Sequence, residues 1–126
     1  MNYIVDSCVW IDYFKYKKHF QEISGLLINN LASVNKIILA ELIPSAQAYK
    51  EYDFIACFSG ISVVPLNIDW DEIMAIQYEC IKSGINKLGL LDIAIAQNAK
   101  QNGMGIFSTN RHMILLCKKT GLMCRT

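Results

Sequence analysis

The chain has 126 residues and a mass of 14.3 kDa, with 53% hydrophobic and 18% charged residues and only two prolines. This length predicts a single domain, residues 1–126, around one core. The composition excludes a disordered, collagen-like or low-complexity chain. The longest uncharged stretch is residues 54–68, which contain Gly60 and Pro65. A membrane-spanning helix needs about 20 apolar residues. We therefore expect a soluble protein that does not enter the membrane.

The cysteines and the N-terminus favour a cytoplasmic protein. The five cysteines are odd in number and widely spaced, and they include no Cys-x-x-Cys pair. A disulfide framework or a zinc site is therefore not expected, and buried reduced thiols are. The first apolar run meets Asp6 at once, with no basic region before it, so no secretory signal is expected.

Charge is distributed unevenly along the chain. All 11 acidic residues lie at or before Asp92, together with seven of the 12 basic residues, which gives a net −4. The remaining residues carry five basic side chains and no acid, which gives +5. This basic C-terminal part could contact phosphates or could be an ordinary solvated face.

Apolar periodicity predicts strands that alternate with helices. Strands are expected at residues 3–5, 36–39, 61–66, 105–107 and 122–124. Helices are expected at residues 8–18, 23–31, 40–58, 69–83, 90–101 and 111–119. The alternation predicts an α/β fold, a three-layer α/β/α sandwich with a central, mostly parallel sheet of four to five strands.

Four polar residues stand where the expected strands end or helices begin. Asp6 and Asn110 follow strands, Asp92 begins a helix, and Glu41 interrupts an apolar run. Sites in parallel sheets form beyond the carboxyl ends of the strands. Singly, Asp6 and Asp92 could be helix caps, and Glu41 could reach the surface. Three carboxylates and an amide at one edge predict a Mg²⁺ or Mn²⁺ site, because the cation offsets their repulsion. Asp12 is expected to face solvent.

These residues also carry a resemblance to a known family. Four segments resemble motifs of the PIN-domain ribonucleases, especially the VapC toxins of bacterial toxin–antitoxin pairs. The segments are residues 4–11 with Asp6, 39–42 with Glu41, 89–96 with Asp92, and 108–113 with Asn110. Their order and spacing match over essentially the whole chain. The chain departs from the family at Asn110, usually a fourth aspartate, and at Cys8, more often serine or asparagine.

The resemblance implies a PIN-like sandwich and a metal-dependent endoribonuclease that hydrolyses RNA phosphodiester bonds as the toxin of such a pair. In this hypothesis Asp6, Glu41 and Asp92 are the catalytic residues and bind Mg²⁺ or Mn²⁺, with Asn110 as a weak fourth ligand. Two hydroxyl residues, Ser7 and Ser108, orient the carboxylates. The candidate contacts to the RNA backbone are Arg111, Lys118 and Lys119. The implied partners are an RNA substrate, a cognate antitoxin and a second copy of the chain in a homodimer.

Two alternatives stay open at this point. A degenerate PIN domain, with Asn110 in place of an acid, would bind RNA or a protein without cutting. Phosphatases of the haloacid-dehalogenase type also place a nucleophilic aspartate after the first strand. They usually have a second aspartate two residues later, where this chain has Cys8, which disfavours that class.

Overall fold

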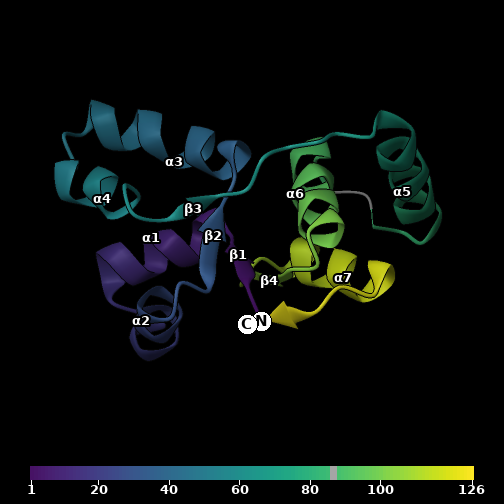
Figure 1. The fold of residues 1–126 in the computed structure, drawn as a ribbon. Helices are drawn as coiled ribbons and strands as arrows, with labels where there is room; N and C mark the ends of the chain where they lie inside the picture. Colours follow the sequence, from purple (N-terminus) through teal and green to yellow (C-terminus); the bar gives the residue numbers. More distant parts are fainter. Residues whose placement is uncertain (86–87) are drawn as a thin grey trace.

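A five-stranded, wholly parallel sheet forms the centre of the molecule, in the order β3-β2-β1-β4-β5. The structure is a computed structural model, and it describes residues 1–85 and 88–126 (Figure 1). The strands are β1 (Tyr3–Val5), β2 (Ala32–Val34), β3 (Ser62–Val63), β4 (Gly105–Phe107) and β5 (Cys124–Arg125).

Helices cover both faces of this sheet. They are α1 (Ser7–Tyr16), α2 (Phe20–Ile28), α3 (Lys36–Ala48), α4 (Tyr52–Cys57), α5 (Trp70–Lys82), α6 (Leu90–Gln101) and α7 (Arg111–Thr120). In Figure 1, α1 to α4 lie on one side of the strands and α5 to α7 on the other. The strand order explains this division. The chain winds outward from β1 through β2 to β3, and then in the opposite direction from β4 to β5. Right-handed crossovers in opposite directions place their helices on opposite faces. The expected three-layer α/β/α sandwich is confirmed.

The core lies around the two central strands. Ile4 of β1 pairs with Ser33 of β2 and with Ile106 of β4. The side chains of Ile4, Ile106 and Phe107 are fully buried between the helical layers. The winding direction reverses between β1 and β4. Such a switch point is where an open parallel sheet forms its binding crevice.

The second strand and the helix after it differ from the prediction. Residues 36–39 are the first turn of α3, and the strand is Ala32–Val34. The Asn35 side chain accepts a hydrogen bond from the Ile38 N–H at 3.0 Å, so it caps a helix where apolar β-branched residues had predicted a strand. The single helix expected over residues 40–58 is divided into α3 and α4 at Lys50, which has a positive φ of 57°. The last strand also begins two residues later than predicted, at Cys124.

The cysteines and Asp12 only partly match the predictions. All five cysteines are free, but only Cys80 and Cys117 are buried. Burial raises the pKa of the Cys117 thiol to about 12. Asp12 is not fully solvated: its carboxylate lies half-buried, 3.9 Å from Nε2 of His19. No helix in the described ranges is long and apolar enough to span a membrane.

Candidate functional site

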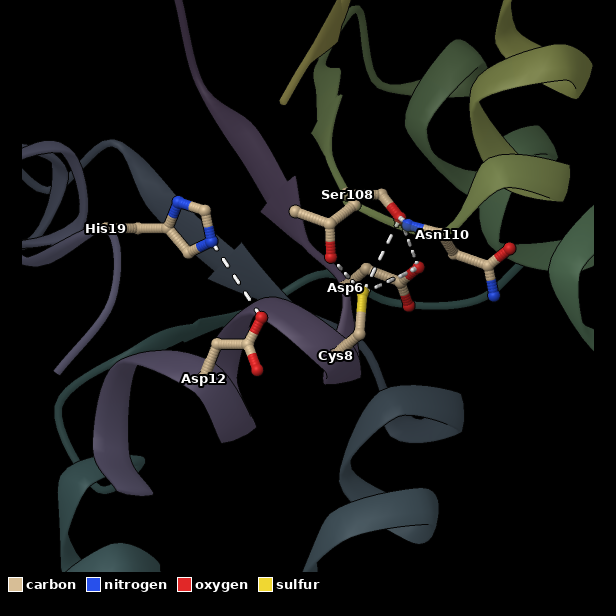
Figure 2. Close-up of polar contacts among 7 residues, drawn as sticks. Asp6, Cys8, Asp12, His19, Ser108 and Asn110 are labelled. Atoms are coloured by element: carbon tan, nitrogen blue, oxygen red, sulfur yellow. Dashed lines mark hydrogen bonds and ion pairs between the residues drawn. The ribbon is translucent and has the colours of Figure 1, made fainter. Parts of the chain in front are cut away.

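Asp6 lies at the switch point. Its carboxylate accepts hydrogen bonds from residues that follow the ends of both central strands, β1 and β4. It is only 5% exposed, and it is the N-cap of α1. Oδ1 accepts a hydrogen bond from the Ser7 N–H at 2.9 Å, and Oδ2 accepts one from the Ser108 hydroxyl at 2.8 Å. The Asp6 N–H donates to the Phe107 carbonyl at 2.9 Å. Asp6 is therefore fixed between the ends of β1 and β4 (Figure 2).

Cys8 belongs to the same cluster, although no role was predicted for it from the sequence. Its Sγ lies 3.7 Å from Oγ of Ser108 and 4.0 Å from Oδ2 of Asp6. The Thr109 hydroxyl donates to this sulfur at 3.4 Å. The signal that could have found it is its position two residues after Asp6, in the first turn of the capped helix. The side chain at residue 8 thus borders the Asp6 carboxylate.

The other two predicted carboxylates come from helices on opposite faces of the sheet. Glu41 lies on α3 and is exposed at the rim of the site. Asp92 lies half-buried in the first turn of α6, where Oδ2 accepts a hydrogen bond from the Gly89 N–H at 3.4 Å. The capping role considered for Asp92 is thus present alongside its place in the site.

The three carboxylates influence one another electrostatically. Burial raises the pKa of Asp6, the hydrogen bonds from Ser108 and Ser7 oppose that rise, and the charge of Asp92 adds to it. The pKa of Glu41 is raised first by burial and then by the charges of Asp6 and Asp92, against a hydrogen bond from Ser7. Because Glu41 is exposed, solvent screens its interactions more than those of Asp6. The charge of Asp92 therefore acts on both Asp6 and Glu41, and the charge of Asp6 acts on Glu41. A shared metal site of the three acids stays a prediction.

The donor set suits a hard divalent cation, but it is not a closed cage. Within residues 1–85 and 88–126, the ion pairs are Lys15–Glu51 and His19–Asp12. No ion pair in these ranges therefore neutralises any of the three acids. Carboxylate oxygens are the ligands that Mg²⁺ and Mn²⁺ prefer. As the side chains stand, however, no three His, Cys, Asp or Glu residues of the described chain are close enough to hold an ion. Binding would require the exposed side chain of Glu41 to turn toward the others.

Asn110 acts as a helix cap in this structure. Its Oδ1 accepts hydrogen bonds from the N–H groups of His112 at 2.9 Å and Met113 at 3.4 Å. Figure 2 shows its carboxamide directed away from Asp6. Only its backbone reaches the cluster, through an N–H that donates to Oγ of Ser108 at 3.0 Å. In the structure this oxygen caps α7. The predicted contact between Asn110 and a metal ion stays a prediction.

A buried amide pair, missed in the sequence, ties the helices that carry Glu41 and Asp92. Nδ2 of Asn35, at the start of α3, donates to Oδ1 of Asn98 on α6 at 3.0 Å. Asn98 in turn donates to the Pro65 carbonyl at 2.9 Å. Both asparagines are at most 2% exposed. The only sequence signal was an amide within an otherwise apolar, alanine-rich helix. This pair fixes the spacing of the helices across the crevice.

The three basic residues predicted to bind RNA occupy opposite ends of α7. Arg111 begins the helix next to Asn110 and is exposed. Lys118 and Lys119 lie in its last turn, about 10 Å farther along the axis. The Lys119 ammonium donates to the Ser83 hydroxyl at 2.7 Å and borders a cavity of about 400 Å³ between α5, α6 and α7, away from the carboxylates. Of the three, Arg111 is the one at the end of α7 next to Asn110, and its contact with RNA stays a prediction.

A shallow, mainly apolar groove of about 340 Å³ lies beside the carboxylates. It is lined by Lys36, Ile37, Ala40, Glu41, Leu66 and Leu91. The groove extends the site from Glu41 between α3 and the start of α6. A ligand larger than a single phosphate can therefore contact the protein next to the acids.

Solved structures share this architecture. The chain is similar to PAE2754 from Pyrobaculum aerophilum, known from a crystal structure, with 17% sequence identity and a TM-score of 0.57. The match covers 98% of this chain and 90% of that one. At this identity the likeness shows the fold alone. No protein-family model matches the chain, and no curated protein matches it.

Proposed function

We propose that the chain is a metal-dependent endoribonuclease that hydrolyses RNA phosphodiester bonds. One observation carries the proposal: the Asp6 carboxylate is buried at the switch point of a parallel sheet, where the charge of Asp92 raises its pKa and the charges of Asp6 and Asp92 raise the pKa of Glu41. Burying a carboxylate that has no cationic partner is unfavourable, and a neutral side chain would avoid this cost. A buried carboxylate beside other acids therefore indicates a functional role. Binding Mg²⁺ or Mn²⁺ is such a role. The resemblance to PIN-domain toxins supports RNA as the substrate, the cytoplasm as the location, and an antitoxin as the regulating partner.

The chain's own residues prepare the site in distinct ways. Ser108 and the Ser7 N–H hold Asp6 in one orientation, with both oxygens already hydrogen-bonded. Asp92 accepts a hydrogen bond from the Gly89 N–H, while Glu41 lies exposed at the rim. A bound divalent ion would supply a water of lowered pKa and stabilise charge on the scissile phosphate. Arg111, exposed at the start of α7, would bind a neighbouring phosphate, an interaction that weakens as salt rises.

Cleavage of total RNA by the purified chain tests this function. We expect cleavage with Mg²⁺ or Mn²⁺ and none with a chelator. Asp6→Asn and Asp92→Asn should each lower the rate by at least about a hundredfold, because each removes a charged metal ligand. Asp53→Asn removes an exposed acid of α4 and is the matched control, which should cleave like the wild type. Cleavage that survives the chelator, or that both site variants retain, rules out the proposal.

A second candidate function is a degenerate PIN domain that binds RNA or protein without hydrolysis. The observation that favours it is Asn110, whose amide oxygen is used to cap α7 where the family usually has an acid. Thermal unfolding under a Mn²⁺ titration separates the two. A ligand of the native state raises the melting temperature, so a metal-dependent enzyme gains stability and a metal-free binding module does not.

A further inference from the structure

One edge of the molecule carries three exposed tyrosines. Tyr16 ends α1, Tyr49 follows α3 and Tyr52 begins α4, and each is more than half exposed. An ion pair of 3.6 Å between Lys15 and Glu51 joins the end of α1 to the turn between α3 and α4. On the left of Figure 1 both segments lie at the outer side of the α1–α4 layer. Single exposed aromatic side chains are ordinary, but three that folding brings to one edge indicate a surface that contacts another molecule.

This surface, residues 15–18 and 49–52, is called the tyrosine edge, and it is positively charged. Its lysines are Lys15, Lys17, Lys18 and Lys50, and all four are exposed. Its one acid is Glu51, already paired with Lys15, and the adjacent Asp53 leaves the excess positive. Lysine is depleted in interfaces between proteins, whereas positive charge beside aromatic rings is typical of surfaces that bind single-stranded nucleic acid. The composition therefore favours a nucleic acid over a protein as the partner.

We infer that the tyrosine edge binds single-stranded RNA, with its tyrosine rings stacked on unpaired bases and its lysines against the phosphates. The ten residues of α1 place Tyr16 about 15 Å along the helix axis from the Asp6 cap. An RNA strand held at the carboxylates therefore reaches this edge by extending over several nucleotides. Bases within a duplex are stacked on one another, so they are not available to the rings. The inference rests on the proposed function for the choice of RNA, but binding here requires neither metal nor hydrolysis.

Fluorescence anisotropy with a labelled oligouridylate of about 12 nucleotides, a length that one such surface can cover, tests the inference. The measurement is made in chelator, so that metal-dependent cleavage does not consume the probe. We expect a Kd of about 1 to 100 μM at about 0.1 M salt. Tyr49→Ala and Tyr52→Ala should each weaken binding at least about fivefold, because the stacking of a base is lost.

Tyr78 provides the matched control. It is 59% exposed against 64% for Tyr52, it also lies beside a lysine, Lys82, and it belongs to α5, away from the tyrosine edge. Tyr78→Ala should therefore bind like the wild type. Tyr49→Phe keeps the ring, so its affinity should stay within about twofold of the wild type.

Salt dependence and competition test the lysines and the preference for unpaired bases. Lys50→Gln should make the slope of log affinity against log salt less steep by about 0.7, the contribution of one phosphate contact on a single strand. Lys82→Gln, on α5, should leave the slope unchanged. An RNA duplex of the same length should compete less well than the single strand. Circular dichroism and thermal unfolding confirm that each variant is folded.

The inference is overturned if the wild type does not bind the single strand in chelator, even if a protein is found to cover this edge. It is also overturned if folded Tyr49→Ala and Tyr52→Ala variants bind like the wild type, or if the duplex competes equally well. The cleavage assay with Mg²⁺ or Mn²⁺ is read separately. Binding that depends on both tyrosines, without cleavage, supports the tyrosine edge and refutes only the proposed hydrolysis. Cleavage together with binding that is indifferent to both tyrosines supports the hydrolysis and refutes the tyrosine edge.

Discussion

The hydroxyl of Ser108 donates to Oδ2 of Asp6 at 2.8 Å, joining the ends of two strands that are 102 residues apart in sequence. Both side chains are buried. The same Ser108 oxygen accepts the Asn110 N–H at 3.0 Å. One hydroxyl therefore orients the central carboxylate and also fixes the turn that begins α7. The conformation of the site and the stability of this end of the sheet depend on the same contact.

Ser108→Ala should destabilise the protein by about 2 to 3 kcal/mol, because it leaves a buried carboxylate oxygen and a backbone N–H without a partner. The pKa of Asp6 should also rise further, since the Ser108 hydrogen bond opposes its elevation. Urea unfolding of the metal-free protein measures the first effect. Thr109→Ala, next in the chain, removes an exposed hydroxyl that contacts only the Cys8 sulfur, and it should change stability by less than about 1 kcal/mol. Equal losses in the two variants would contradict the role given to Ser108.

The Asn35–Asn98 pair gives a second prediction. Asn35→Ala removes the cap of α3 and leaves Oδ1 of Asn98 buried without its donor, so we expect a loss of about 2 to 4 kcal/mol. Because the pair spaces the helices of Glu41 and Asp92, metal affinity should fall as well. Asn29→Ala removes an exposed side chain that donates to the Gly25 carbonyl, and it should cost less than about 1 kcal/mol. Urea unfolding and Mn²⁺ isotherms measure both quantities. A stable Asn35→Ala protein with normal metal affinity would show that the pair is dispensable.

The sequence predicted the parts of this structure that depend on local pattern. Apolar runs followed by polar residues located β1 and β4, and apolar periodicity located α6. The rule that parallel strands end at one edge led to the prediction that Asp6, Glu41 and Asp92 form one site, and that site stays a prediction. The Ala32–Val34 strand was missed because its three side chains are small and of mixed polarity, so they form no clear apolar pattern. All three are buried in the folded sheet, which the local sequence does not reveal. The Asn35–Asn98 contact was missed because a bond across 63 residues leaves no local signal.

The raised pKa values of Asp6 and Glu41 predict how stability depends on pH. Both groups bind protons more tightly in the folded protein than their ordinary values of 3.8 and 4.5 would give. Their stabilising contribution is therefore fully present below those values and is lost as the pH rises through the folded pKa values. We expect the metal-free wild type to lose stability relative to Asp6→Asn as the pH is raised from about 4.5 toward neutrality.

Thermal unfolding of both proteins in chelator, across that pH range, measures this difference. With Mn²⁺ in place of chelator the sign should reverse, because metal binding requires ionised carboxylates and strengthens as the pH rises. A difference between wild type and Asp6→Asn that does not change with pH would show that the Asp6 carboxyl is not perturbed.

Asn110 allows the capping role and the metal role to be separated by substitution. Asn110→Ala removes the oxygen that accepts the His112 and Met113 N–H groups, so the protein should lose about 1 kcal/mol of stability. Asn110→Asp keeps a capping oxygen and adds a negative charge, which the N-terminus of α7 favours and the nearby acids oppose. We expect these opposing effects to leave the metal-free stability of Asn110→Asp within about 1 kcal/mol of the wild type.

Metal binding distinguishes the two roles of residue 110. An aspartate offers two charged oxygens in place of one neutral carbonyl, so Asn110→Asp should bind Mn²⁺ several times more tightly and cleave RNA faster at low Mn²⁺. Asn110→Ala should bind Mn²⁺ nearly as the wild type does, since the Asn110 carboxamide is directed away from Asp6 (Figure 2). Metal isotherms and cleavage rates of the three proteins measure these effects. If Asn110→Asp changes neither affinity nor rate, residue 110 is only the cap of α7. Three carboxylates, without a fourth, would then make up the acidic part of the site.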